Sequence, residues 1–251
     1  MQPRGLPGPS PWQLQNYRRD NDLRIGVGAF KSEKIGKRYI GSAFCFDNDG
    51  VFKEFDCYKD NDLDRIVVSI RKALGAFITA DTQAERVIIH YYKTMSKKHS
   101  KKITDMRMRI NIPLYIVTIN KTEASDYVGF DTAHPGLMPL SGTYVKLGYN
   151  EFLHYNNSRY GSEGRWDYLF PVKVKLYKIF PGATPEYSVL RMEEVRDLLC
   201  QIYKFSRMYW KSFKQQNLPI TIKYHEMVAE IVPHLEDDYL PEFGKRNLWF
   251  L

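Results

Sequence analysis

The chain has 251 residues, 43% of them hydrophobic and 14% aromatic, and a net charge of +8 at pH 7 with a pI near 9.2. This composition excludes a disordered chain, and the length suits one large domain or two small ones. The sequence has neither a run of about 18 apolar residues, as a membrane helix needs, nor an N-terminal apolar core of signal-peptide type, so we expect a cytoplasmic protein with no membrane partner. So basic a chain favours polyanions, and nucleic acid is the commonest in the cytosol.

The cysteines are three in number and far apart: Cys45, Cys57 and Cys200. An odd number at these spacings predicts neither a disulfide framework nor a zinc site. We therefore expect all three to be small buried hydrophobes.

The first part of the chain predicts a leading segment followed by an antiparallel meander. Residues 1–22 are rich in proline, glycine and polar side chains, which is typical of a segment without regular structure. A domain is predicted from residue 23 to residue 251. It opens with three apolar stretches in quick succession: LRIGVGAF, RYIGSAFCFD and VFKEFDCY. The polar, glycine-terminated turn at 47–50 predicts a hairpin between the last two.

The middle of the chain alternates helical and strand patterns. Apolar residues recur at helical spacing in 60–78, RVIIHYY (86–92) is a buried strand, 101–110 is a basic helical segment, and LYIVTIN (114–120) is another strand. This order after a meander predicts an α/β domain with a mixed sheet.

The last third predicts three more strands and two helices. The strands are SGTYVKLG, YNEFLHYN and FPVKVKLYK. An amphipathic helix over 191–213 has one apolar stripe and a separate basic face, and a second helix follows Pro219.

The order of the C-terminal segments resembles an Argonaute PIWI domain of prokaryotic type. The segments are YSVL, the helix ending YWKSFKQQNLP, then ITIKYHEMVAEI and the terminal LWFL. At the other end, PWQL and LRIGVGAF stand in the order of the opening PIWI strands. The resemblance runs from about Trp12 to Leu251 and is strongest over 187–251. It implies the α/β ribonuclease H-like fold, in which helices flank a mixed sheet.

Nuclease activity in this family needs four carboxylates, because hard oxygen ligands must hold two divalent ions roughly 3.5–4 Å apart. The resemblance puts the first carboxylate position at Gly28 and the third in the turn Tyr91-Tyr92-Lys93, with Tyr92 in place of an aspartate. Neither position offers a carboxylate. We therefore expect a catalytically inactive domain that has no catalytic residue and no metal cofactor for catalysis.

The two remaining carboxylate positions have acidic residues at or near them. The fourth falls on Glu226, beside His225, and the mobile second one has three nearby candidates: Glu54, Asp56 and Asp62. Glu226 alone is more typical of a solvated helix residue, and His90 of a packed histidine. A single carboxylate does not hold a two-metal centre.

The resemblance also implies a binding site for the guide strand. In Argonautes the helix and loop that precede the final helix contact guide phosphates near the 5′ end. The matching nucleic-acid-binding positions are Lys211, Lys214, Asn217 and Lys223, with Arg191 as a looser match and the C-terminal carboxylate of Leu251 near the 5′-phosphate. Lysine and asparagine donors suit phosphate contacts that do not read sequence. The alternative is a solvated basic helix face. A Mg²⁺ ion at the guide 5′-phosphate is the one cofactor that remains open.

A second basic run has only Asp105 against it and carries no motif. Its members are Lys93, Lys97, Lys98, Lys101, Lys102, Arg107 and Arg109. The run either lies along a guide–target duplex or forms a solubilising surface, and the sequence favours neither.

The resemblance implies a module that holds a guide RNA or DNA and its complementary target, with sequence read by base pairing. A role in defence against foreign DNA, together with a separate effector protein, is implied in the same way. Two alternatives stay open: a divalent-metal-dependent nuclease with displaced carboxylates, and a ribonuclease H-like interaction scaffold. A MID domain normally precedes PIWI, and we expect it on a second polypeptide, or this chain to be part of a longer protein.

Overall fold

The computed structural model describes residues 22–31, 38–46, 52–59, 63–79, 85–107, 112–124, 126–156, 170–179, 189–209, 217–231, 234 and 242–245. The predicted leading segment, apart from Asp22, and the predicted turn at 47–50 lie outside these ranges. So does the terminal LWFL.

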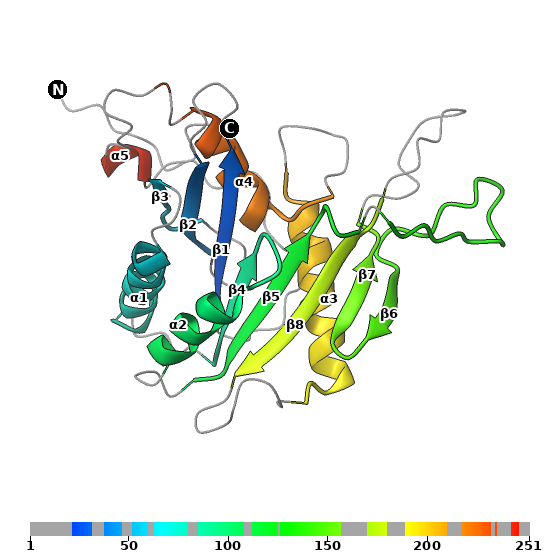
Figure 1. The fold of residues 1–251 in the computed structure, drawn as a ribbon, viewed down its shortest axis with the longest axis horizontal. Helices are drawn as coiled ribbons and strands as arrows, with labels where there is room; N and C mark the ends of the chain where they lie inside the picture. The colour runs from blue at the N-terminus through cyan, green and yellow to red at the C-terminus, as the bar shows by residue number, and fades with distance from the viewer. Residues whose placement is uncertain are drawn as a thin grey trace.

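Eight strands form one mixed sheet (Figure 1). They are β1 (Asp22–Lys31), β2 (Arg38–Phe46), β3 (Asp56–Lys59), β4 (Arg86–Tyr91), β5 (Leu114–Asn120), β6 (Tyr144–Gly148), β7 (Glu151–His154) and β8 (Val172–Ile179). Their order is β3-β2-β1-β4-β5-β8-β7-β6. Strands β1, β4 and β5 run parallel, and the other neighbours are antiparallel. The predicted meander and mixed sheet are confirmed.

Helices cover both faces of the sheet. They are α1 (Leu63–Thr79), α2 (Lys97–Arg107), α3 (Met192–Ser206), α4 (Ile220–Ile231) and the short α5 (Glu242–Lys245). On one face Ile70 of α1 and Ile103 of α2 pack in one cluster with Ile25 and Ile89 of the parallel strands. On the other face Leu198 and Ile222, from α3 and α4, pack against Val117 and its neighbours. The sheet is therefore a central layer between two helical layers, as the α/β prediction requires.

The burial patterns of the strands agree with a sheet that lies between two helical layers. The residues of β8 alternate between buried and half-buried, and β4 and β5 are almost continuously buried, as strands covered by helices on both faces must be. Within the described ranges no helix combines the length and the apolar character needed to cross a membrane.

Some boundaries differ from the prediction. Helix α2 begins at Lys97 rather than Lys101, because the Ser96 hydroxyl accepts a hydrogen bond of 3.2 Å from the His99 amide and starts the helix in a polar turn that has no apolar period. Helix α5 has four residues and was not predicted. Of the cysteines, Cys45 is buried, but Cys57 is half-buried and Cys200 is exposed, so the expectation that all three are buried is wrong.

Candidate nucleic-acid interface

The carboxyl ends of the parallel strands β1 and β4 bring together the positions that the sequence marked for nuclease chemistry. The Tyr92 amide, just after β4, donates a hydrogen bond of 3.1 Å to the Val27 carbonyl of β1. Gly28 and the turn Tyr91-Tyr92-Lys93 are therefore neighbours. This is the edge at which open α/β sheets bind ligands.

Helix α4 fills the space beside Gly28. A Cβ atom on Gly28 would lie 2.6 Å from the His225 Cβ, and a Cβ on Gly26 would lie 1.8 Å from the Thr221 carbonyl oxygen. Both distances are shorter than real contacts of a Cβ atom. The two glycines therefore let α4 lie directly on β1, and the position of the first carboxylate is occupied by a helix.

Two buried histidines fix this contact. The His225 Nε2 donates a hydrogen bond of 2.7 Å to the Gly26 carbonyl, and the His90 Nδ1 hydrogen-bonds the Thr221 hydroxyl at 2.7 Å. Both imidazoles are fully buried, which confirms the interpretation of His90 as a packed histidine. Burial lowers the pKa of each to about 3, with a further lowering of the His90 pKa by the nearby Arg24 charge. Both rings are neutral at neutral pH.

The turn after β4 carries no metal ligand of the required kind. The Tyr91 hydroxyl is committed to a 2.6 Å hydrogen bond with His99 Nδ1. The ammonium group of Lys93 lies 5.0 Å from the centre of the Tyr92 ring, a cation–π contact. A fixed positive charge at this point repels a divalent cation.

Two of the acidic candidates, Glu226 and Asp56, are paired with lysines. Glu226 accepts from Lys223 at 3.0 Å, and Asp56 lies 3.8 Å from the Lys245 ammonium. Asp62 lies outside the described residues. Across the part of the chain that the structure describes, His, Cys, Asp and Glu side chains form no group of three that could hold a metal ion. The described residues at this edge do not fit a two-metal centre.

Two of the predicted guide-contact residues lie together at the start of α4. The Asn217 amide donates to the Phe170 carbonyl at 2.8 Å, and the Asn217 carbonyl accepts from the Asn156 amide at 2.8 Å. No described residue accepts the second side-chain amide hydrogen of Asn217, which can therefore bind a ligand. Lys223 is about a quarter exposed and must share its ammonium with Glu226. Lys211, Lys214 and Leu251 lie outside the described residues.

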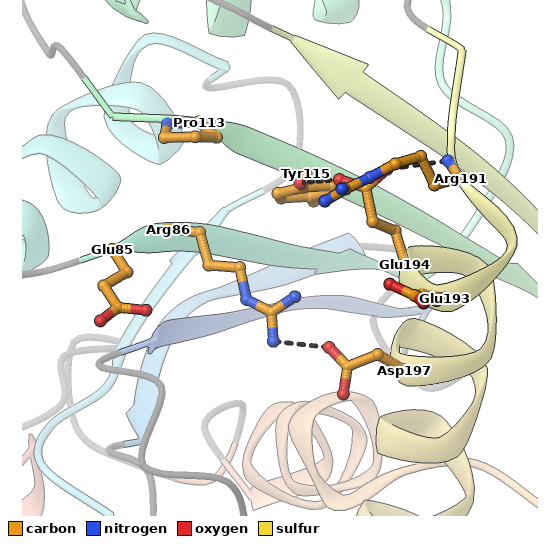
Figure 2. A pocket seen from close by; sticks show the side chains of 8 residues that line it. All are labelled: Glu85, Arg86, Pro113, Tyr115, Arg191, Glu193, Glu194 and Asp197. Carbon is orange, nitrogen blue, oxygen red and sulfur yellow. Dashed lines mark hydrogen bonds and ion pairs between the residues drawn. The ribbon is translucent and has the colours of Figure 1, made fainter.

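The structure does not bring Arg191 into this group. Arg191 caps the amino end of α3, whereas Asn217 follows the carboxyl end. The helix has 15 residues, so its ends are about 22 Å apart. Arg191 is 75% exposed there. It lines a pocket of about 250 Å³ at the amino ends of β4 and β5 together with Glu85, Arg86, Pro113, Tyr115, Glu193, Glu194 and Asp197 (Figure 2).

The deeper charges of this pocket are matched within the protein. The Arg86 guanidinium donates to Asp197 at 2.5 Å (Figure 2). It also donates to Asp22 at 2.6 and 2.9 Å. Glu194 accepts from the Tyr115 hydroxyl at 2.7 Å and also pairs with Lys178. These contacts hold the strand ends to α3. No motif in the sequence could have revealed them, because the Arg86–Asp197 partners are 111 residues apart.

Arg207, at the carboxyl end of α3 and on its predicted basic face, also has a structural role. The Arg207 guanidinium donates a hydrogen bond to the Asn156 carbonyl and lies 4.5 Å from the centre of the Tyr203 ring. Asn156 in turn donates to Asn217. Arg207 therefore supports the loop that leads into α4.

This architecture, a mixed sheet with helices on both faces, matches the ribonuclease H-like fold of Argonaute PIWI domains. No family model matches the sequence. The chain is 24% identical over 278 aligned residues to a Piwi protein of Archaeoglobus fulgidus, and the match covers 97% of this chain and 62% of that relative.

Solved structures agree. The crystal structure of Drosophila Piwi matches with a TM-score of 0.63 at 15% identity, over 92% of this chain and 32% of that one. Marinitoga piezophila Argonaute in complex with a 5′-OH guide RNA matches with a TM-score of 0.59 at 18% identity, over 84% of this chain and 30% of that one. The fold is that of the Argonaute PIWI domains, and the sequence is similar to that of a Piwi protein, as the C-terminal segments predicted.

Proposed function

We propose that the chain is a nucleic-acid-guided binding module that holds a guide strand and its paired target through phosphate contacts without cutting the target. The observation that carries the proposal is the contact of α4 with β1, which fills the position of the first nuclease carboxylate. The likeness to Argonaute structures that hold a guide RNA, and a guide RNA with target DNA, supports the nucleic-acid part.

Absence of cleavage follows from the donors at the carboxyl edge. Cleavage by two metal ions needs several anionic oxygens around one point. At this point the chain supplies Gly28, two tyrosines and the ammonium group of Lys93. Glu226 stands at the fourth carboxylate position of the family pattern, and its charge is balanced by Lys223.

Binding rests on side chains that suit phosphate oxygens. Lys223 supplies a point charge and Asn217 a single free amide hydrogen, while base pairing between guide and target supplies the sequence information. The further proposed contacts are Lys211, Lys214 and Leu251, with Mg²⁺ at the guide 5′-phosphate. The further proposed partners are a MID-containing polypeptide and an effector protein, in defence against foreign DNA.

The alternative of a nuclease with displaced carboxylates lacks support among the described residues. Asp56 and Glu226 each face a lysine, and they lie on different elements, β3 and α4. An interaction scaffold without nucleic acid would leave the charge of +8 unexplained.

A titration separates the three functions. The chain is titrated with a duplex of a 5′-phosphorylated guide and its target, in Mn²⁺ and again in EDTA, and both affinity and strand integrity are recorded. We expect salt-dependent binding in both buffers, with the target intact in both. An absence of binding would contradict the proposal and favour a scaffold, and Mn²⁺-dependent loss of the target would favour a nuclease.

A further inference from the structure

The turn after β4 and the first half of α2 carry four lysines that the proposed guide site does not use: Lys93, Lys97, Lys98 and Lys101, here called the α2 lysine cluster. The last three are exposed and Lys93 is half-buried. None of the four pairs with a carboxylate among the residues that the structure describes. The next lysine, Lys102, differs because it pairs with Asp64 of α1.

Two hydrogen bonds fix the α2 lysine cluster beside the carboxyl edge of the sheet. The Tyr91 hydroxyl, at the end of β4, bonds His99 Nδ1 in the first turn of α2 at 2.6 Å, and the Tyr92 amide bonds Val27 of β1. Helix α2 lies on the same face of the sheet as α1, and α4 packs against β1 on the opposite face. The α2 lysine cluster and Lys223 therefore flank the ends of β1 and β4 from opposite faces.

Two ammonium groups of the α2 lysine cluster, those of Lys93 and Lys98, lie close to His99. The pKa of His99 is lowered by its partial burial and then by the charges of Lys93, Lys98 and Lys102. Like charges held this close repel one another, although solvent screens much of that repulsion. A polyanion that matches the spacing lowers the repulsion further and releases its own counterions.

We infer that the α2 lysine cluster is a second phosphate-binding surface, which contacts the backbone of the guide–target duplex on the side of the carboxyl edge opposite Lys223. Lys93 contributes the innermost charge, held against the Tyr92 ring at the edge itself. The occupant is a nucleic-acid duplex because its regularly spaced phosphates can reach both flanks at once. This inference rests on the proposed function and adds a site to it.

The test compares two variants that each remove three positive charges. Lys97→Gln/Lys98→Gln/Lys101→Gln removes the exposed part of the α2 lysine cluster. The matched control is Lys72→Gln/Lys146→Gln/Arg196→Gln, which removes three exposed cations from α1, β6 and α3. Binding of a pre-annealed guide–target duplex is measured between about 50 and about 200 mM salt, the range in which phosphate contacts dominate.

The salt slope of the α2 variant should become shallower by about 0.9 for each phosphate that its lysines no longer neutralise, and the slope of the control should change by less than about one in total. Replacing all three lysines by arginine should restore the slope. Equal slopes for the α2 variant and the control would overturn the inference. Circular dichroism confirms that each variant is folded.

A scan with single neutral methylphosphonates locates the contacts. At some positions in the duplex a methylphosphonate should weaken binding to the unaltered chain but not to the α2 variant. These positions should differ from those at which Lys223→Gln removes the effect of the methylphosphonate. An effect of Lys223→Gln with none of the α2 variant would overturn the inference and leave the proposed function standing. Failure of the unaltered chain to bind any duplex would instead overturn the proposed function.

Discussion

Gly28 and Gly26 lie where β1 passes closest to α4, and no side chain fits at either point. The His225 Cβ occupies the space that a carboxylate-bearing side chain would need at Gly28. An aspartate there would be overpacked, and its charge would be buried beside a neutral imidazole. Absence of the first metal ligand and the seating of α4 are thus one structural feature.

We predict that Gly28→Asp destabilises the fold and does not create cleavage. Overpacking alone costs about 1–3 kcal/mol, and a buried unpaired carboxylate adds to this. The control is Gly75→Ala in α1, where a Cβ meets no atom within 4 Å and should stabilise the helix by about 0.5–1 kcal/mol. Urea unfolding measures both; a Gly28→Asp variant as stable as the parent would show that α4 does not seal this position.

The buried histidines predict a pH dependence of stability. In the unfolded chain His90 and His225 take up protons below pH about 6.5, but in the fold their pKa values are lowered to about 3. Protonation therefore favours unfolding: their contribution is complete above pH 6.5 and is lost as the pH falls toward 3.

Urea unfolding at pH 7.5 and pH 5 should show this loss. Two histidines lose up to about 4 kcal/mol between pH 6.5 and pH 5, at about 1.4 kcal/mol per pH unit for each. His154, whose pKa burial lowers to about 4, acts in the same direction. Unchanged stability over this range would mean that these rings are accessible to protons in the fold.

At the scale of elements, α4 has two roles: it packs on β1, and it carries Lys223 of the proposed guide site. Its first turn carries Thr221 and Lys223, and its next turn carries His225 and Glu226, so the face on β1 and the face toward a ligand alternate. The Lys223–Glu226 pair is local to the helix, at the i,i+3 spacing.

Substitutions of the two partners should change the affinity for a duplex in opposite directions. Lys223→Gln should weaken duplex binding and make the salt slope shallower by about 0.9. Glu226→Gln should strengthen binding, because it frees the ammonium of Lys223 and removes a negative charge near phosphates. Equilibrium binding at two salt concentrations measures both. A Glu226→Gln variant that binds more weakly would indicate that the carboxylate holds a cation or positions the helix.

Elements with a clear period were predictable, and contacts between distant elements were not. The apolar runs of β4 and β5 and the stripe of α3, from Val195 to Phe205, predicted their burial correctly. The polar first turn of α2 has no such period, so its start was missed. The pattern at Gly28 predicted a missing carboxylate, but not that His225 fills the gap, because the two segments meet across 199 residues of sequence, as in the His225–Gly26 bond.

At the scale of the molecule, one edge of the sheet carries both a set of lysines and the positions at which the nuclease carboxylates are missing. Lys223 of α4 and the α2 lysine cluster flank the ends of β1 and β4, and the space where a nuclease needs carboxylates holds α4, two tyrosines and Lys93. The part-buried charge pairs of Arg86, at the amino ends of the strands, hold the opposite edge together. A duplex laid on the carboxyl edge would be held on two flanks and cut on neither.

The most direct measurement is the fate of a target strand bound to the guide-loaded chain. A target labelled at both ends is incubated in excess chain with a complementary guide in Mg²⁺, Mn²⁺ or EDTA, and retention and length are recorded together. We predict that the target stays full-length in all three buffers, is retained in each and is released by salt. A product cut opposite the middle of the guide in Mn²⁺, and absent in EDTA, would contradict the claim that this edge binds without cutting.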